Sequence, residues 1–178
     1  MEEYQGVFSS SGNSDALFLQ LRAKYWTLCA LVVAHVMLTG YIDPLDASNN
    51  LIQLILYFVQ VGFLIGVMMA FFLLTSNSLF IKLSRYDFYF SEFRVLYAAF
   101  AVELALMLTV KIYQGVQLYS RGSYLDPWLD PAFNVLWVLQ RIMLLLFWVI
   151  TITNADLAFE PRLYDVNYIA GLAHPAEE

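Results

Sequence analysis

Four long stretches of apolar residues, separated by short polar segments, dominate the sequence. They cover about residues 25–42, 51–74, 94–119 and 131–153. Each is close to the ~20 residues that an α-helix needs to cross the hydrocarbon core of a bilayer. The pattern therefore predicts an all-α membrane protein in which residues 15–153 form a bundle of four transmembrane helices.

The polar segments between these stretches contain turn chemistry. An Asp-Pro pair at 43–44 ends the first helix, and Asp130 and Pro131 supply an N-cap and a first helical residue for the fourth. The second stretch meets no such breaker, so its helix could continue to Leu83. Residues 85–92, RYDFYFSE, are expected to form an aromatic loop at the headgroup level, where tyrosine is enriched.

Both ends of the chain are polar. Residues 1–14 are expected to form a disordered N-terminal tail, followed by a short amphipathic helix with Ser14 or Asp15 as its N-cap. No basic segment precedes a short apolar run, so no removable signal peptide is expected. Residues 154–178 form the predicted C-terminal tail. Within this tail, residues 160–168 belong to a segment rich in Leu, Tyr and Ile, and they are expected to be ordered against a neighbouring protein.

Composition supports the membrane assignment. The chain is 61% hydrophobic and 13% charged, whereas soluble domains are roughly 45–50% apolar and about 25% charged. The net charge of −6 and the scattered basic residues argue against nucleic acid as a partner. Cys29 is the only cysteine, which excludes an internal disulfide and a cysteine metal cluster, and it is expected to be a small buried hydrophobe.

The distribution of basic residues predicts the orientation. Six of those that flank the spans fall on the side of the two termini: Arg22, Lys24, Lys82, Arg85, Arg94 and Arg162. Arg121 is the only basic residue in the two opposite loops. Because cytoplasmic loops carry the excess of Lys and Arg, both termini are expected to be cytoplasmic.

Each span contains one strongly polar residue about ten positions from its entry. These residues are His35, Gln60, Glu103 and Arg141. At 1.5 Å per residue each lies roughly 13–15 Å into the bilayer, which predicts a single polar layer. A central arginine costs roughly 2.5–3.5 kcal/mol on insertion scales, but thirteen Leu, Ile, Val and Phe residues in 132–153 outweigh it. Arg141 is expected to contact Glu103 directly or through one water.

Helical angle predicts which faces point inward. Polar residues share one face on each of the last three spans: Gln53 and Gln60; Glu103, Lys111, Gln114 and Gln117; Asn134 and Arg141. The second span also has small residues at four-residue spacing, Gly62, Gly66 and Ala70, a pattern that lets helices approach closely. Ala30 and Ala34 of the first span could complete an internal seam, which we favour, whereas a helix of another protein would make the same face a docking site.

The polar layer has two interpretations. A relay through His35, Glu103 and Arg141 would conduct protons or ions. A structural ion pair that fixes helix packing is favoured, because a proton pathway needs titratable groups at stepped depths. His174 lies in the tail, so no histidine pair could hold a haem. No hydrolase or phosphate-loop motif is present. Neither enzymatic activity nor a cofactor or metal is expected.

Short motifs carry a family resemblance. The segments IQL at 52–54, YFVQ at 57–60 and WVLQR at 137–141, with Glu160-Pro161 and then Tyr164-Asp165, resemble the corresponding parts of the transmembrane protein 138 family. The match extends from about residue 52 through the third span and resumes over about 133–165. The resemblance implies a four-span protein of the ciliary base and transition zone, needed for cilium assembly and for delivery of ciliary membrane proteins.

Three functions stay open at this point. The first is a non-enzymatic assembly subunit that joins other integral membrane proteins in a ciliary complex. The second is an accessory subunit of a different complex, for instance in an organellar inner membrane such as that of mitochondria. The third is a proton- or ion-conducting bundle. Partner contacts are expected on the aromatic loop, the hairpin that follows the third span, and the C-terminal tail.

Overall fold

A computed structural model of the chain describes residues 11–42, 50–121 and 126–164. The described part is 91% helical and contains no strand. Its four long helices are α2 (Ser11–Ile42), α3 (Asn50–Thr75), α6 (Arg94–Arg121) and α7 (Pro131–Leu157). Each is long and apolar enough to cross a membrane, which confirms the predicted all-α fold with four transmembrane helices. The tails and turns predicted at 1–10, 43–49, 122–125 and 165–178 lie outside the described residues.

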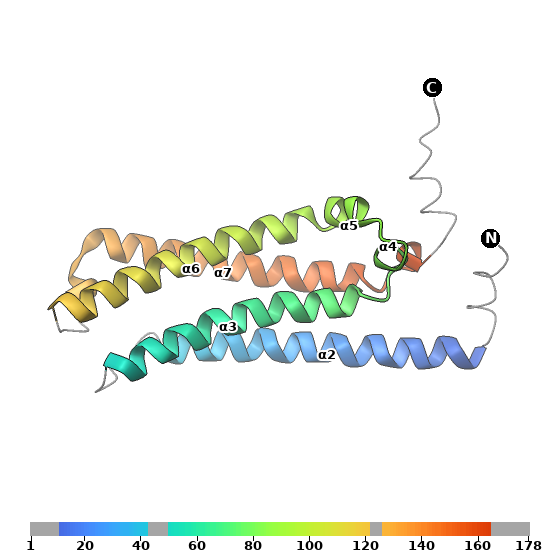
Figure 1. Ribbon diagram of the computed structural model, residues 1–178, viewed down its shortest axis with the longest axis horizontal. Coiled ribbons are helices and arrows are strands. Elements are labelled where there is room, and N and C mark those ends of the chain that lie inside the picture. The colour runs from blue at the N-terminus through green and yellow to red at the C-terminus, as the bar shows by residue number, and fades with distance from the viewer. Residues whose placement is uncertain (1–10, 43–49, 122–125, 165–178) are drawn as a thin grey trace, which may run out of the picture.

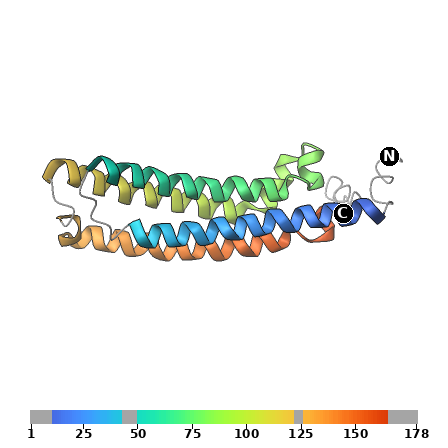
Figure 2. The same cartoon turned by 90° about the horizontal axis from the view of Figure 1, so that it is seen from below.

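The long helices form two pairs (Figures 1 and 2). Helix α2 lies alongside α3 and α6 lies alongside α7, while contacts between α3 and α6 join the pairs. The start of α2, the end of α3, the start of α6 and the end of α7 lie at one end of the bundle. We call the half at that end the terminal half. The hairpin half is the other one, where α2 and α6 end and α3 and α7 begin.

Helix α3 stops at Thr75, so the predicted continuation to Leu83 is wrong. Hydroxyl side chains compete for backbone groups there: Ser76 Oγ donates to the Leu73 carbonyl at 2.7 Å. The backbone N–H of Ser78 then donates to the Thr75 carbonyl at 2.9 Å, which closes a turn. A one-turn helix, α4 (Leu79–Lys82), follows the turn.

The predicted aromatic loop is also wrong, because residues Tyr86–Glu92 form helix α5. The turn before it has Ser84 in the left-handed region, at φ 55°. The N–H groups of Ser84 and Arg85 donate to the carbonyls of Ile81 and Phe80, the pattern of a Schellman C-cap. This turn directs α5 back over the end of the bundle.

Two helices extend into segments predicted to be tails. Helix α2 begins at Ser11 and runs unbroken for 32 residues, so the predicted N-cap at Ser14 or Asp15 is wrong. No proline interrupts this stretch. Helix α7 continues one turn beyond residue 153, where Asn154 Nδ2 donates to the Ile150 carbonyl at 2.7 Å. Its predicted start is confirmed, since the Asp130 side chain accepts from the Ala132 N–H and Pro131 opens the helix.

The first part of the C-terminal tail packs on its own bundle. A short 3-10 helix, η2 (Pro161–Tyr164), contacts α4. Leu163 is buried, and Tyr164 Oη donates to the Ala158 carbonyl at 2.8 Å. Burial raises the pKa of Tyr164. The residues up to Tyr164 are therefore ordered against the chain's own bundle, while contact with a neighbouring protein stays a prediction. Residues 165–168 lie outside the described part.

The terminal half contains the apolar core. Its largest buried side chains include Phe71 of α3, Phe147 of α7, and Phe93, which lies between α5 and α6. Tyr89 of α5 is fully buried beside them, and its hydroxyl bonds Thr75 Oγ1 at 2.8 Å and the Tyr97 hydroxyl at 3.1 Å. Burial raises the pKa of Tyr89 far above its usual range.

Candidate polar site in the bundle

The middle of the bundle and its hairpin half bury polar side chains instead. The buried polar residues there are His35, Thr39, Gln53, Gln60, Glu103, Lys111, Gln114 and Gln140. On α3 they alternate with Tyr57 and Leu64 at spacings of three and four, which keeps them on one inner face. Because each buried polar atom needs a partner, their hydrogen bonds determine what this region can do.

Glu103 is fully buried on α6, and its partner is Gln140 of α7. The distance from Gln140 Nε2 to Glu103 Oε1 is 2.6 Å. The predicted direct contact between Glu103 and Arg141 is therefore wrong. Consecutive residues on a helix point about 100° apart. The side chain at position 140 faces α6, whereas the side chain at 141 faces α2.

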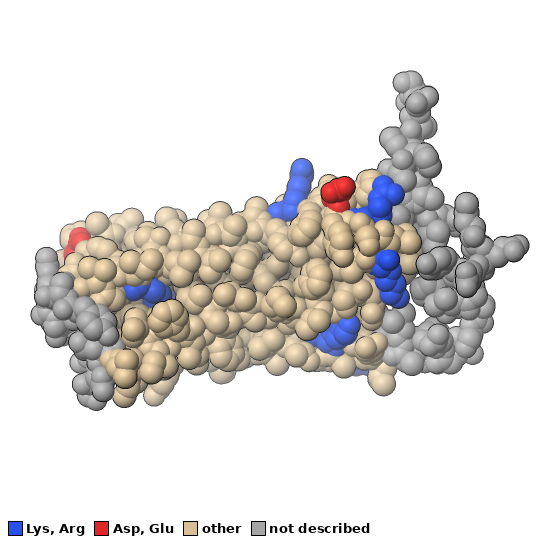
Figure 3. Space-filling view, in the orientation of Figure 1, with Lys and Arg blue, Asp and Glu red and all other residues tan. Residues whose placement is uncertain are grey.

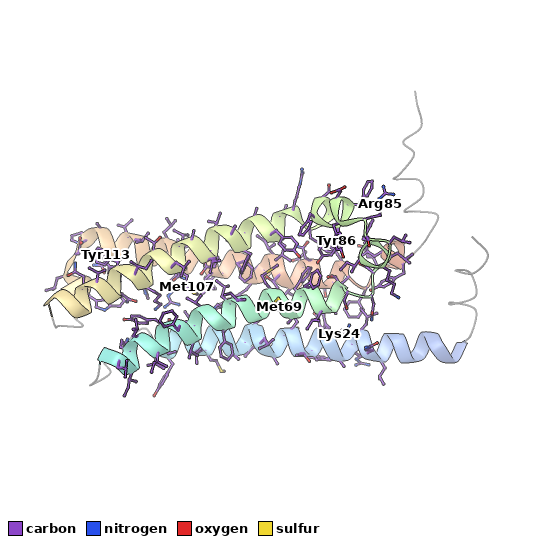
Figure 4. The ribbon with its side chains drawn as sticks, viewed as in Figure 1. Lys24, Met69, Arg85, Tyr86, Met107 and Tyr113 are labelled. Atoms are coloured by element: carbon purple, nitrogen blue, oxygen red, sulfur yellow. The ribbon has the colours of Figure 1, made fainter. Side chains whose placement is uncertain are left out.

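The sequence did contain a signal for Gln140. Phe133, Gln140 and Phe147 are all buried on α7 and are seven residues apart. Phe133 and Phe147 define the inner face of α7. This face is offset by one residue from the face that contains Asn134 and Arg141. Following the phenylalanines rather than the charge would have predicted the glutamine as the interhelical donor. On α6, Met107 lies one turn beyond Glu103 and is also fully buried, so the two residues share the inner face of that helix (Figure 4).

Arg141 caps the end of α2. Its Nη2 donates to the Thr39 carbonyl at 3.4 Å, and its guanidinium lies 4.9 Å from the centroid of the Trp137 ring. The carbonyls in the last turn of a helix lack intrahelical donors and form the negative end of its dipole. Side chains on a helix tilt toward its N-terminus, which for α7 is the hairpin end. The charge of Arg141 is therefore displaced from the layer that was predicted at the centre.

His35 and Gln60 are fully buried, as expected for an inner layer. The His35 ring makes an edge contact with Trp148, with ring centroids 6.3 Å apart, and both of its ring nitrogens lack a hydrogen-bond partner. Arg141 donates to the Thr39 carbonyl, and Thr39 Oγ1 donates to the His35 carbonyl one turn away at 2.6 Å. Of the four predicted residues, His35 and Arg141 are thus neighbours, whereas Glu103 bonds to Gln140.

Lys111 is a second cation of this region, and unlike Arg141 it is buried. It is 8% exposed, and its Nζ donates to Gln114 Oε1 at 3.3 Å and lies 4.7 Å from the centroid of the Tyr57 ring. The Gln53 side chain donates to the Tyr57 hydroxyl at 3.2 Å. Residues of α3 and α6 are thereby joined through an amide, a phenol and an ammonium group.

The glycine face of α3 does not form the predicted tight internal seam. Gly62 is exposed and Gly66 is half-buried, and a Cβ built at either would meet no atom within 4 Å. Ala30 is exposed, while Ala34 and Ala70 are half-buried. The inner face of α3 is instead occupied by larger side chains such as Tyr57 and Leu64.

Within the described residues, no group of three or more His, Cys, Asp or Glu side chains is placed to hold a metal ion. Buried polar groups join helices to one another in the middle of the bundle and in its hairpin half. Comparisons with protein families, with curated proteins and with solved structures find no match to this chain. The resemblance to the transmembrane protein 138 family therefore stays a prediction from its motifs.

Proposed function

We propose that the chain is a non-enzymatic integral membrane protein that acts as an assembly subunit of a ciliary membrane complex at the ciliary base or transition zone. In that role it would support cilium assembly and the delivery of membrane proteins. The observation that carries the structural part is the use of polar side chains to join helices. Glu103 bonds to Gln140, and Arg141 to the Thr39 carbonyl. Such bonds fix helix register within a bilayer. The ciliary address rests on the family resemblance alone.

We also propose that both termini face the cytoplasm. Arg22, Lys24, Lys82, Arg85 and Arg94 belong to the terminal end of the bundle, and Figure 3 has most of the basic side chains on its face near that end. Lumenal loops carry fewer such residues. Labelling cysteines placed at Ser48 and Ser123 from outside, but not at Ser10 or Ala176, would support this orientation, and the reverse pattern would contradict it.

The partner surface in this proposal is formed by α4 and α5. Leu83, Tyr86 and Phe90 are 40%, 46% and 49% exposed there, and Figure 4 has Tyr86 beside Arg85 at the terminal end. Beneath them, buried Tyr89 fixes the helix through its bonds to Thr75 and Tyr97. We assign this patch to the membrane-proximal segment of another integral membrane protein, since it lies where the spans leave the bilayer.

The test combines location with capture of native partners. A tagged copy is expected at the ciliary base, and Tyr86→Ser with Phe90→Ser should release its membrane-protein partners. The matched control is Tyr41→Ser, which removes an aromatic side chain that is 69% exposed at the opposite end. Location of the tagged copy in the mitochondrial inner membrane would refute the ciliary assignment. Partners retained by a folded Tyr86→Ser, Phe90→Ser variant would refute the surface.

A further inference from the structure

A groove of about 540 Å³ lies between α2 and α7 in the hairpin half. Three of its lining residues are tryptophans: Trp128 of η1 (Asp126–Leu129) and Trp137 and Trp148 of α7. The remaining lining is apolar, Gly40 and Leu145 included, except for Arg141. The groove thus combines one cation with a long apolar surface that faces the membrane.

The guanidinium in this groove is held in a fixed orientation. The Trp137 ring lies below it, and the Thr39 carbonyl accepts one of its hydrogen bonds. A guanidinium has five N–H donors arranged in a planar fork, so it can serve a carbonyl and a second acceptor together. Phosphate oxygens match this fork, and the pairing is charge-assisted.

Depth places this cation near the polar boundary of the bilayer. Helix α7 has 27 residues and is about 40 Å long, so about 5 Å extends beyond each side of a ~30 Å core. The guanidinium lies over Trp137, about 9 Å from the start of the helix by the same rise per residue. It is therefore about 4 Å inside the boundary, within reach of lipid phosphate and ester groups. Leu144 and Leu145 lie about 15 Å inside the boundary, at the level of the acyl-chain ends, and Trp148 lies beyond the midplane.

We propose that this groove binds one phospholipid from the leaflet at the hairpin end. Its phosphodiester group pairs with Arg141, and one acyl chain follows the groove to Leu144 and Leu145, near the midplane. Charge complementarity at the rim and the apolar surface below it identify the occupant. The inference does not depend on the ciliary role.

Two other grooves provide internal controls. One lies between α3 and α6 and contains Lys111, which is bonded to Gln114 and only 8% exposed. The other lies between α6 and α7 and contains Arg94 at the terminal end. Neither has a tryptophan in its lining. Removing either cation should leave the lipid at Arg141 in place.

The experiment uses the full chain, exchanged into nanodiscs of phosphatidylcholine, released into detergent and weighed by native mass spectrometry. The wild type should retain one phospholipid per chain. Arg141→Gln should reduce the apparent affinity roughly tenfold, about the effect of one lost charge-assisted bond, while Arg94→Gln and Lys111→Gln retain it. Since Arg141→Gln also uncaps α2, Leu145→Trp serves as a second variant that narrows the groove and leaves the cation unchanged. It should lose the lipid as well.

Several results would overturn the proposal. One is full retention of phosphatidylcholine by a folded Arg141→Gln variant. If that variant does not fold, retention by Leu145→Trp has the same meaning. Equal retention of diacylglycerol, which lacks the phosphate, would refute the pairing with Arg141. Equal binding of soluble phosphocholine would show that the site recognises free phosphate esters rather than a lipid.

Discussion

The two halves of the bundle share four helices but have different cores. The terminal half packs large aromatic side chains such as Phe71 and Phe147, and short elements cover its end. The middle of the bundle and its hairpin half bury amides, a carboxyl group and one ammonium group, together with the ring of Phe133. Lipid tails are as apolar as leucine, so apolar side chains in a membrane gain little from leaving lipid and associate mainly through packing. Dense packing holds the first half together, and directed polar bonds hold the second.

Each half nevertheless uses the same device at a helix end. Lys24 of α2 donates to the Leu73 carbonyl at 2.8 Å and to Ser76 Oγ at 3.1 Å, at the C-terminus of α3 (Figure 4). Arg141 of α7 donates to Thr39 at the C-terminus of α2. In both cases a cation on one helix satisfies the carbonyl end of its neighbour. Lys24 and Arg141 therefore lie where the dipole of a neighbouring helix stabilises a positive charge.

Truncating a core aromatic residue in the terminal half should have the largest effect. Phe147→Ala removes a fully buried ring that lies 6.2 Å from the Phe100 ring, centroid to centroid. Loss of a buried phenylalanine costs about 3–5 kcal/mol in folded cores. Unfolding in bicelles titrated with SDS measures the loss. A change below ~1 kcal/mol would contradict a packing-dominated half, and Val149→Ala, at a 64% exposed position, is the control.

A smaller loss is expected when the polar half loses one partner. Gln140→Leu keeps the volume but leaves the buried Glu103 carboxyl without the donor now 2.6 Å away. Hydrogen bonds to charged groups contribute about 1.5–3 kcal/mol to stability. The same SDS titration should report a loss in that range. Unchanged stability would show that the bond contributes nothing to the fold.

The buried tyrosine of α5 should make stability depend on alkaline pH. Tyr89→Phe removes bonds to Thr75 and Tyr97 and should cost about 1 kcal/mol at neutral pH. The pKa of Tyr89 is raised in the folded state. Its stabilisation is therefore complete below the unfolded pKa of about 10 and is lost as pH rises toward the folded value. Wild type should weaken above pH 10 more steeply than Tyr89→Phe, and parallel pH profiles would contradict this.

The smallest effect should be a gain. Ser84 adopts φ 55° in the turn between α4 and α5, where glycine carries no steric penalty. Ser84→Gly should therefore stabilise the terminal end by about 0.5–1 kcal/mol. Hydrogen exchange at the α5 amides measures this locally, and faster exchange in the variant would contradict it. Ser91→Gly, within helix α5, should have the opposite effect.

Hydrophobic patterning predicts the four spans because 20-residue apolar stretches have few alternatives in a bilayer. It also predicts the start of α7, where Asp130 and Pro131 have definite capping roles. It does not predict which polar residue faces inward. A long arginine can extend its charge toward the interface, whereas a short glutamine cannot, so Gln140 takes the inner position and Arg141 the outer one.

The helix at 86–92 was missed for a related reason. Tyr86, Tyr89, Phe90 and Phe93 recur at helical spacing, but tyrosines next to a span are equally typical of an interfacial belt. Only Tyr89 and Phe93 are fully buried. Their burial depends on contacts with the end of α3, which local sequence does not contain.

Glu103 should be coupled energetically to Gln140 and not to Arg141. Two double-mutant cycles test this directly, with Leu replacing each residue singly and in pairs, and unfolding followed by SDS titration. The cycle of Glu103 with Gln140 should give a coupling energy of about 1 kcal/mol or more, with the double variant milder than the single variants predict. The cycle of Glu103 with Arg141 should give a value near zero. Strong coupling of Glu103 to Arg141, with none to Gln140, would contradict the account.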